Sequence, residues 1–286
     1  MPSAATPTVP PTAASSAWII LRTCIEERLV YRGDFALGTL MRFLPIITQI
    51  FLWTAVFAKA STDNGAINGY TSTSIIAYYL LTMLGRAFSS MPGLASGIAG
   101  QIRSGEIKKF MIQPIDLLEF LLLARVAHKL VYYAVAAGPF ALVFWLCGEY
   151  FPDWPSAERF VAFVLSLLLG FALGFFLEAT LGLIGFWFLE VSSLLFVYML
   201  FNFFFSGHMF PLEFLEGAVP PWVETLLFVQ PLQYLAYYPA AIWLGRIEDA
   251  DLWTGLAIEF AWVVFFFVAA RCAMHYGYKR YSGFGG

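Results

Sequence analysis

Residues 160–177 read FVAFVLSLLLGFALGFFL, a run of 18 residues without a charged side chain. About 20 residues of α-helix cross the roughly 30 Å hydrocarbon core of a bilayer, so this run approaches the length of a membrane span. The rest of the chain has the same character, because 60% of its 286 residues are hydrophobic, 12% are charged and the mean hydropathy is +0.75. Soluble domains carry roughly 25% charged residues. The sequence therefore predicts an all-α integral membrane protein.

Further apolar runs on both sides of this segment predict six transmembrane helices within a domain over residues 35–270. We expect the spans at about 35–58, 70–98, 118–148, 160–177, 183–205 and 252–270, with a short return over 178–185. The amphipathic segment 17–34 precedes them and is expected to lie in the membrane interface. Residues 1–16 are predicted to form a disordered cytoplasmic tail, and residues 271–286 a second cytoplasmic tail.

The basic residues predict the orientation of these spans, because cytoplasmic loops carry an excess of Lys and Arg. With the N-terminus in the cytoplasm, 12 of the 16 basic residues lie on the cytoplasmic side. Only Lys59, Arg159 and Arg246 lie outside, and Arg86 lies within a span. We therefore expect a multi-pass protein of the cytoplasmic (inner) membrane with both termini in the cytoplasm.

One segment allows two interpretations. Residues 225–245 contain no charged side chain and are long enough to span. A seventh span would export the C-terminal basic residues, and Pro231 and Pro239 would interrupt it. We favour a re-entrant region over about 207–246, in which short helices dip into the membrane from outside.

Motifs of several enzyme classes are absent from the sequence. There is no Gly-Lys pair, so the chain lacks an ATP-binding P-loop, and there is no G-x-S-x-G or H-E-x-x-H. The three histidines lie on different sides of the predicted membrane and the three cysteines show no paired spacing, so no metal site or cofactor is expected. No basic face exists to bind nucleic acid. We expect that the chain is not itself an enzyme.

Three carboxylates fall in or near apolar runs. Charged groups inside a membrane are costly, and they usually face a partner, the bundle interior or a water path. Glu190 and Glu259 are therefore candidates for a proton route or for a polar patch in a substrate path, and a structural role is equally open. Glu178 is expected at a helix turn, where a structural role is favoured.

The most polar internal segment lies between the second and third spans. Residues 102–117 read IRSGEIKKFMIQPIDL and predict a short amphipathic cytoplasmic helix over about 101–117. The residues alone leave open whether this segment is a solvated connection or a helix that docks on a soluble partner and transmits its motion. This run resembles the coupling segment of type-two ABC exporter permeases, which combines a Gly, an acidic or apolar residue, basic residues and a Pro. The residues that the resemblance assigns to ATPase coupling are Arg103, Gly105, Glu106, Lys108, Lys109, Phe110, Gln113 and Pro114.

A second resemblance to the same family lies after the fifth span. Residues 205–215 (FSGHMFPLEFL) and 220–245 (PPWVETLLFVQPLQYLAYYPAAIWLG) are similar to the family's extracellular re-entrant region, although Gln230-Pro231-Leu232 stands where an apolar-Pro-Phe sequence is commoner. The tail YKRYSGFGG at 278–286 resembles one branch of these permeases. The likeness covers about residues 17–286. The candidate gate residues are Ser206, Gly207, Pro211, Pro221, Trp222 and Pro231.

The resemblance implies the permease of an exporter that moves its substrate outward by alternating access. It implies a separate ATP-binding subunit in two copies, with ATP and Mg bound there, and a second permease that is identical or homologous. Basic side chains of the coupling segment would pair with an acidic rim, while Ile107, Phe110, Met111 and Ile112 would fill a groove.

The implied substrate path lies between the two permeases, lined by the second and fifth spans. Any single aromatic residue at the outer end of the fifth span can simply face lipid or the core, but together they suggest an apolar gate, which favours an amphipathic or lipid-like substrate over a small hydrated ion. The candidate path residues are Glu190, Asn202, Phe203, Phe204, Phe205 and Glu259. The alternatives are a proton-coupled secondary transporter that uses Glu190 and Glu259, and a scaffold that transports nothing.

Overall fold

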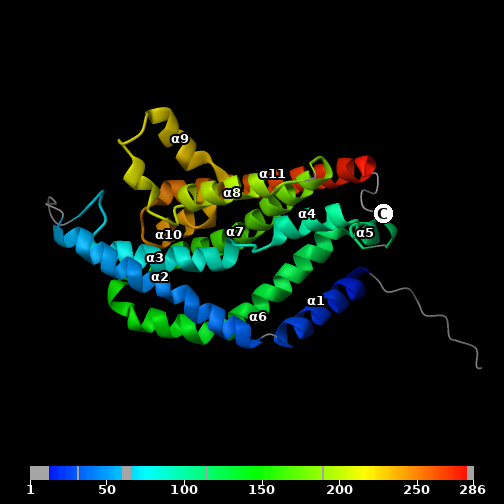
Figure 1. The fold of residues 1–286 in the computed structure, drawn as a ribbon. Coiled ribbons are helices and arrows are strands. Elements are labelled where there is room, and N and C mark those ends of the chain that lie inside the picture. Colours follow the sequence, from blue (N-terminus) through cyan, green and yellow to red (C-terminus); the bar gives the residue numbers. More distant parts are fainter. Residues whose placement is uncertain are drawn as a thin grey trace, which may run out of the picture.

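A computed structural model describes residues 13–30, 32–59, 66–113, 115–151, 153–188 and 190–281. These residues form helices and connecting turns, without β-strands (Figure 1). The α-helices are α1 (Ala13–Val30), α2 (Arg32–Lys59), α3 (Ser72–Ser89), α4 (Leu94–Ser104), α5 (Lys108–Ile112), α6 (Leu117–Leu146), α7 (Ala157–Leu183), α8 (Ser192–Phe205), α9 (Pro221–Val229), α10 (Tyr237–Trp243) and α11 (Asp249–Arg280). Within the described ranges four 3₁₀ helices join them: η2 (Gly148–Tyr150), η3 (Ile184–Phe186), η4 (Leu212–Leu215) and η5 (Pro231–Leu235).

Helix α7 is the centre of the packing. It contacts α11 along its length and also α3, α4 and α10. The helix is apolar around most of its circumference, so it can be buried on several sides at once. Helices α1, α2 and α6 form a second group, in which α6 packs against both α1 and α2 (Figure 1).

The molecule has two distinct ends. Figure 1 shows α5, the end of α4 and the C-terminal end of α11 gathered at one end, hereafter the α5 end, while α9 and α10 lie toward the other. Each end has its own buried cluster. Ile98, Ile107, Leu117 and Phe186 belong to the cluster at the α5 end. The cluster toward α10 is built around tyrosines and aliphatic side chains of α3, η5 and α10.

Three helices among the described residues are long and apolar enough to cross a membrane. They are Leu117–Leu146, Ala157–Phe186 and Asp249–Arg280. Shorter apolar helices cover Leu44–Lys59 and Ser192–Phe205. The prediction of an all-helical membrane protein is therefore confirmed, whereas the count of six spans stays a prediction.

The fourth and fifth spans differ from the sequence-based expectation. The predicted return over 178–185 is wrong, because α7 continues through Glu178 to Leu183. The next α-helix begins only at Ser192, after the short η3, so Glu190 precedes α8. The sequence interpretation took Glu178 as a breaking residue, but α7 passes through this position, and Glu178 lines a cavity with several polar residues, as described below.

The second predicted span is broken in two. Helix α3 ends at Ser89 and α4 begins at Leu94, with Pro92 between them. Proline has no amide proton and disfavours a helical conformation in the preceding residue, so it interrupts the helix.

The chain ends also differ in detail from the predicted boundaries. The first helix covers 13–30 where 17–34 was predicted, and α11 continues to Arg280 beyond the expected end of the last span. Most of the predicted N-terminal tail, residues 1–12, and residues 282–286 lie outside the described residues.

Candidate coupling segment and membrane cavities

The predicted coupling segment forms two short helices instead of one. Helix α4 ends at Gly105, which has a φ of +82°, a conformation that glycine adopts without the steric cost of a side chain. The chain then turns through Ile107, whose amide donates to the carbonyl of Gln101 at 3.1 Å, and continues as α5. The single helix expected over 101–117 is therefore wrong, because Gly105 reverses the backbone within it.

The apolar side chains of this segment divide between the interior and the surface. Ile107 is fully buried and Phe110 is 8% exposed, with its ring 5.5 Å from that of Phe120 on α6. Met111 and Ile112 are exposed, Ile112 by 83%. The expectation that all four fill a groove on a partner is thus wrong for Ile107 and Phe110, which anchor the segment to its own protein.

The polar candidate residues of this segment are exposed, as Met111 and Ile112 are. The side chains of Arg103, Glu106, Lys108, Lys109 and Gln113 are exposed, and Pro114 lies outside the described residues. Three cations and two apolar side chains of this short segment are therefore exposed, while Ile107 and Phe110 are buried in the protein. We call the exposed residues Arg103, Lys108, Lys109, Met111 and Ile112 the coupling surface.

Two ion pairs connect this segment to the spans. Arg103 Nη1 donates to Glu190 Oε2 at 3.2 Å, just before α8. On the other side, Asp116 caps α6 by accepting from the amide of Glu119 at 2.9 Å and pairs with Arg271 of α11 at 2.6 Å. Hydrogen bonds from Ser192 and the Arg103 cation hold the pKa of Glu190 below its ordinary value, so this carboxylate is ionised at neutral pH.

The break between α3 and α4 is stabilised by side chains of α6. Lys129 is 8% exposed and donates from Nζ to the carbonyl of Ser90 at 2.9 Å and to that of Ala87. Arg125 Nη1 donates to the carbonyl of Pro92 at 3.0 Å. The carbonyls at a helix C-terminus carry partial negative charge, so these cations match the end of α3.

The start of α4 lies near an acidic residue. No side chain caps this helix at Gly93, and Glu178 of α7 lines a cavity together with Met91 and Ala95 at the start of α4. Unpaired backbone groups are costly at membrane depth, and at this break the cations of α6 satisfy carbonyls at and just after the end of α3. The sequence carried a signal for the cations, since Arg125 and Lys129 are four residues apart on one helix face.

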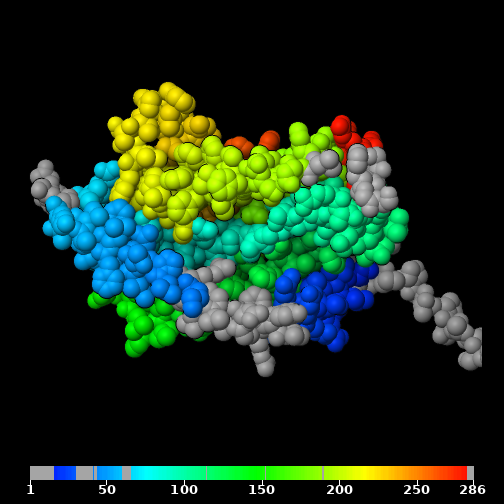
Figure 2. Space-filling view, in the orientation of Figure 1, coloured from blue at the N-terminus to red at the C-terminus, as the bar shows by residue number. Residues whose placement is uncertain are grey.

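Two cavities lie beside this break. The first, which we call the break cavity, has a volume of about 360 Å³ and is lined by residues that include Arg86, Glu178, Tyr198 and Asn202. The second, the α2–α8 cavity, has a volume of about 610 Å³ and includes Gln49, Met83, Phe203 and His208. Both cavities are lined by Arg86, Ser90 and Pro92. Figure 2 shows the surface of α8 beside that of α4, in agreement with the contacts between these helices.

The structure does not bring the six candidate path residues together. Asn202 lines the break cavity and Phe203 the α2–α8 cavity. Phe205 lines a third, apolar cavity of about 510 Å³ between α7, α8, α9 and α11. Phe204 is 42% exposed.

The two carboxylates among these candidates have different surroundings. Glu190 is exposed and paired with Arg103, whereas Glu259 is fully buried on α11 beside α7. This arrangement does not favour a proton route that uses both residues.

The predicted re-entrant region consists of short helices that fold back on α8 and α3. Gly207 has a φ of +77°, and a Cβ there would lie 2.5 Å from Tyr237 Cβ, so this position requires glycine. The amide of Tyr237 donates to the carbonyl of Ser206 at 2.9 Å, and Tyr78 donates to the carbonyl of Gly207. The candidate prolines start helices, with Pro211 before η4, Pro221 first in α9 and Pro231 first in η5, and Trp222 is 70% exposed.

Gln230, where the sequence departs from the family's usual pattern, links two of these elements. Its Nε2 donates to the carbonyl of Phe205 at 2.7 Å, and its Oε1 accepts from the amide of Leu232 at 2.6 Å. An apolar side chain at this position could make neither bond. Gln230 therefore fixes the end of α8 to the start of η5, a role that the sequence interpretation did not assign.

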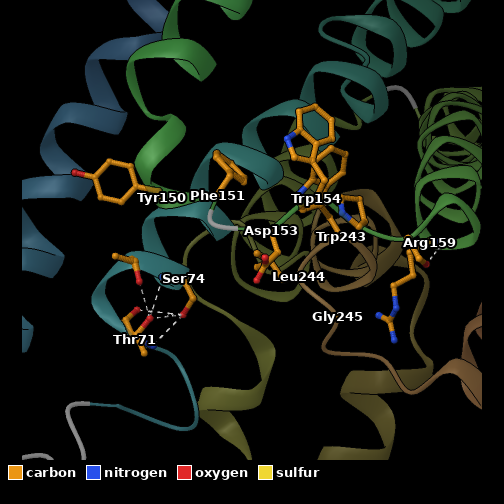
Figure 3. A pocket seen from close by; sticks show the side chains of 13 residues that line it. Thr71, Ser74, Tyr150, Phe151, Asp153, Trp154, Arg159, Trp243, Leu244 and Gly245 are labelled. Carbon is orange, nitrogen blue, oxygen red and sulfur yellow. Dashed lines mark hydrogen bonds between the residues drawn. The ribbon is translucent and has the colours of Figure 1, made fainter.

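A further pocket of about 430 Å³ lies at the end away from α5, between the starts of α3 and α7 and the end of α10 (Figure 3). Tyr150, Trp154 and Trp243 supply its aromatic wall, and the two Trp rings lie 5.6 Å apart. Arg159 reaches away to Asp249 on α11 at 2.6 Å. Aromatic side chains of this kind are typical of membrane–water interfaces.

These features define the class of the protein as an α-helical membrane protein with an interrupted helix beside internal cavities. A family model described as "ABC-2 family transporter protein" matches residues 43–285, which is more than four-fifths of the chain. The chain belongs to this family, so the resemblance inferred from its motifs is confirmed. No curated protein matches the chain. Membership makes the chain the membrane permease of an ABC transporter, a subunit without its own ATPase domain, and implies an ATPase partner.

Proposed function

We propose that this permease works in an ATP-driven exporter that moves an amphipathic or lipid-like substrate outward by alternating access. Two ATP-binding subunits hydrolyse ATP with Mg, and a second permease, identical or homologous, completes the complex. The complex resides in the cytoplasmic (inner) membrane, with the α5 end and both termini in the cytoplasm.

The observation that carries this proposal is the coupling surface itself. Arg103, Lys108 and Lys109 give it positive charge, while the exposed Met111 and Ile112 give it an apolar centre. A surface of this chemistry fits a groove with an acidic rim on a soluble partner. Because Ile107 and Phe110 fix the segment from inside, force applied at the surface is transmitted to the spans.

The two ion pairs indicate which helices receive this force. One pair leads from Arg103 to Glu190 and the start of α8, and the other leads from Asp116 to Arg271 and α11. Closure of two ATPases on ATP would thus move α8 and α11 together with α4. Helix α8 lies beside the cavities, and the short helices from η4 to α10 cover its end, so its movement can open and close a path there.

Reversing the charge of the coupling surface tests this function. The double variant Lys108→Glu/Lys109→Glu should still fold and enter the membrane, but it should retain far less ATP-binding subunit during purification. Lys59→Glu is the matched control, because Lys59 ends α2 at a distance from the α5 end and is also exposed. Equal retention of the ATPase by the double variant and the control would contradict the proposal.

A further inference from the structure

The pocket shown in Figure 3, hereafter the aromatic pocket, combines aromatic rings with a carboxylate. Its volume of about 430 Å³ lies in the range of small-molecule sites, roughly 300–1,000 Å³. Its lining includes Phe151, Trp154 and Trp243 together with Asp153. In Figure 3 the Phe151 ring lies toward one side of Asp153, and the two Trp rings lie toward the other. A ligand in this space would therefore meet ring surfaces and a negative charge at once.

Packing against the rest of the protein holds two of these rings in place. The Trp243 ring lies 4.9 Å from that of Phe163 on α7, and the Phe151 ring stacks on that of Phe144 on α6 at 5.5 Å. Trp154 is 80% exposed, and its ring lies 5.6 Å from that of Trp243 at an interplanar angle of 55°. The two Trp rings thus form a corner instead of a stack, and they offer ring surface from two directions.

The hydroxyl groups in the lining are engaged within the protein. At the start of α3, Thr71 Oγ1 bonds to Thr73 Oγ1 at 2.8 Å and to Ser74 Oγ at 3.2 Å. The Ser156 hydroxyl caps α7 by accepting from the amide of Arg159 at 3.3 Å. A sugar loses hydrogen bonds to water on binding and needs protein groups that replace them, so this lining is poorly suited to one.

The two charged side chains of the lining differ in their partners. Arg159 donates to the carboxylate of Asp249 at 2.6 Å and to the carbonyl of Ile247 at 2.9 Å, so its charge is compensated within the protein. Asp153 is exposed, and its carboxylate has no ion pair or hydrogen bond among the residues that the structure describes. A single carboxylate provides too few oxygen ligands for Ca²⁺ or Mg²⁺. The pocket therefore favours an organic cation.

We propose that the aromatic pocket binds a quaternary ammonium group, such as the trimethylammonium group of choline. This group has no N–H to donate, so aromatic faces and a nearby carboxylate are what attract it. Trp attracts cations most strongly among the aromatic side chains, within about 6 Å of the ring centre. The site lies apart from the coupling surface and from the cavities beside the broken helix, so it goes beyond the proposed function.

The test measures binding to the purified full chain in a maltoside detergent by titration calorimetry. Choline is the probe, and its neutral analogue, in which a carbon replaces the nitrogen, is the control of equal shape. We expect choline to bind at least about fivefold more tightly than this analogue, since the rings and Asp153 attract only the charged form. Equal binding of the two, or displacement of choline by an equal concentration of sodium, would overturn the proposal.

Two variants assign the binding to this pocket. Trp154→Leu and Asp153→Asn should each weaken choline binding by about fivefold or more, because each removes part of the attraction. Both side chains are exposed, so the fold should tolerate these changes. The matched controls are Trp145→Leu and Asp251→Asn, at exposed positions outside the lining. Unchanged choline binding in both pocket variants, or an equal loss in the controls, would overturn the proposal.

Dodecylphosphocholine separates the two sources of a trimethylammonium group, because it carries this group on a phosphate and an alkyl chain. Binding that is tighter than that of choline and is lost in Trp154→Leu supports a lipid head group as the ligand. Equal or weaker binding supports a free cation. Failure of both probes to bind would overturn the site and leave the proposed function unaffected, because the measurement uses the permease without its ATPase.

Discussion

Arg103 of α4 and Glu190, two residues before α8, form an ion pair of 3.2 Å that joins the coupling surface to the helix beside the cavities. The two residues are 87 positions apart in the sequence. Figure 1 shows α4 and the start of α8 at the same end of the molecule. A movement of α4 can therefore reach α8 directly, without passing through α6 or α7.

Reversing this ion pair should affect coupling more than stability, because both side chains are largely exposed. We expect Arg103→Glu and Glu190→Arg each to lower substrate transport per ATP hydrolysed. The swapped double variant should recover most of it. The measurement is transport and ATP hydrolysis by the reconstituted complex, and single variants with normal coupling would show that the pair plays no part.

The same pair should be insensitive to pH over the neutral range. The pKa of Glu190 lies below its ordinary value because Ser192 donates to it and Arg103 is nearby, so the pair is fully present above the ordinary pKa of glutamate. It is lost only as the pH falls through the lowered pKa. Transport per ATP should thus be constant from pH 6 to 8. Even the lower limit of this range lies more than about one pH unit above the ordinary glutamate pKa of roughly 4.3. The prediction would be contradicted if transport per ATP fell within this pH range in the wild-type complex and if the Glu190→Gln variant no longer showed that fall.

Replacing Gly105 with a residue that has a side chain should uncouple ATP hydrolysis from transport. In the left-handed conformation a residue with a Cβ costs about 1–2 kcal/mol, so Gly105→Val should change the turn between α4 and α5. We expect ATP hydrolysis to continue while transport falls. Gly100→Val is the control, because Gly100 lies within α4 and a Cβ there meets open space. Equal coupling ratios in the two variants would remove the role assigned to Gly105.

Removal of the Lys129 cation should destabilise the broken helix. Lys129→Met leaves the carbonyls of Ala87 and Ser90 with fewer donors in a buried site, and hydrogen bonds to charged groups contribute about 1.5–3 kcal/mol. The thermal midpoint of the purified chain should fall clearly. Leu130→Met, at the exposed neighbouring position, should leave it nearly unchanged. A Lys129→Met protein as stable as this control would show that the break does not depend on the cation.

Glu259 distinguishes the exporter from the proton-coupled alternative. This residue is fully buried on α11, and the account gives it no part in transport. Glu259→Gln should therefore leave ATP-driven transport unchanged, and stability should stay equal or rise because a buried acidic group is removed. The proton-coupled alternative would be supported by two results together: the folded Glu259→Gln variant loses transport, and an uncoupler alone abolishes transport by the wild-type protein.

The sequence predicts the coarse architecture well because the information is local. Uncharged runs such as 160–177 identify membrane-length helices, and the spacing from Gly105 to Gln113 points to the family that the comparison then confirms. The boundaries around Glu178 could not be predicted in the same way. Helix α7 continues through this carboxylate, which lines a cavity with Met91 and Ala95, residues more than 80 positions away in the sequence.

The candidate site was predicted only in part for the same reason. Exposed cations such as Lys108 are found by their residue type, but the inward direction of Ile107 and Phe110 depends on the turn at Gly105. Arg86 was assigned simply to a span, and the two cavities that it lines arise from residues of α2, α3, α4 and α8 together. Long-range packing of this kind leaves no periodic signal in a single sequence.

The central claim is that this permease is driven by a separate ATPase, and the mass of the complex purified intact from its native membrane tests it most directly. The account predicts two permeases with two ATP-binding subunits in one particle, and loss of those subunits in the Lys108→Glu/Lys109→Glu variant. A wild-type chain that purifies without any ATP-binding subunit, while its transport continues in ATP-depleted vesicles, would contradict the account.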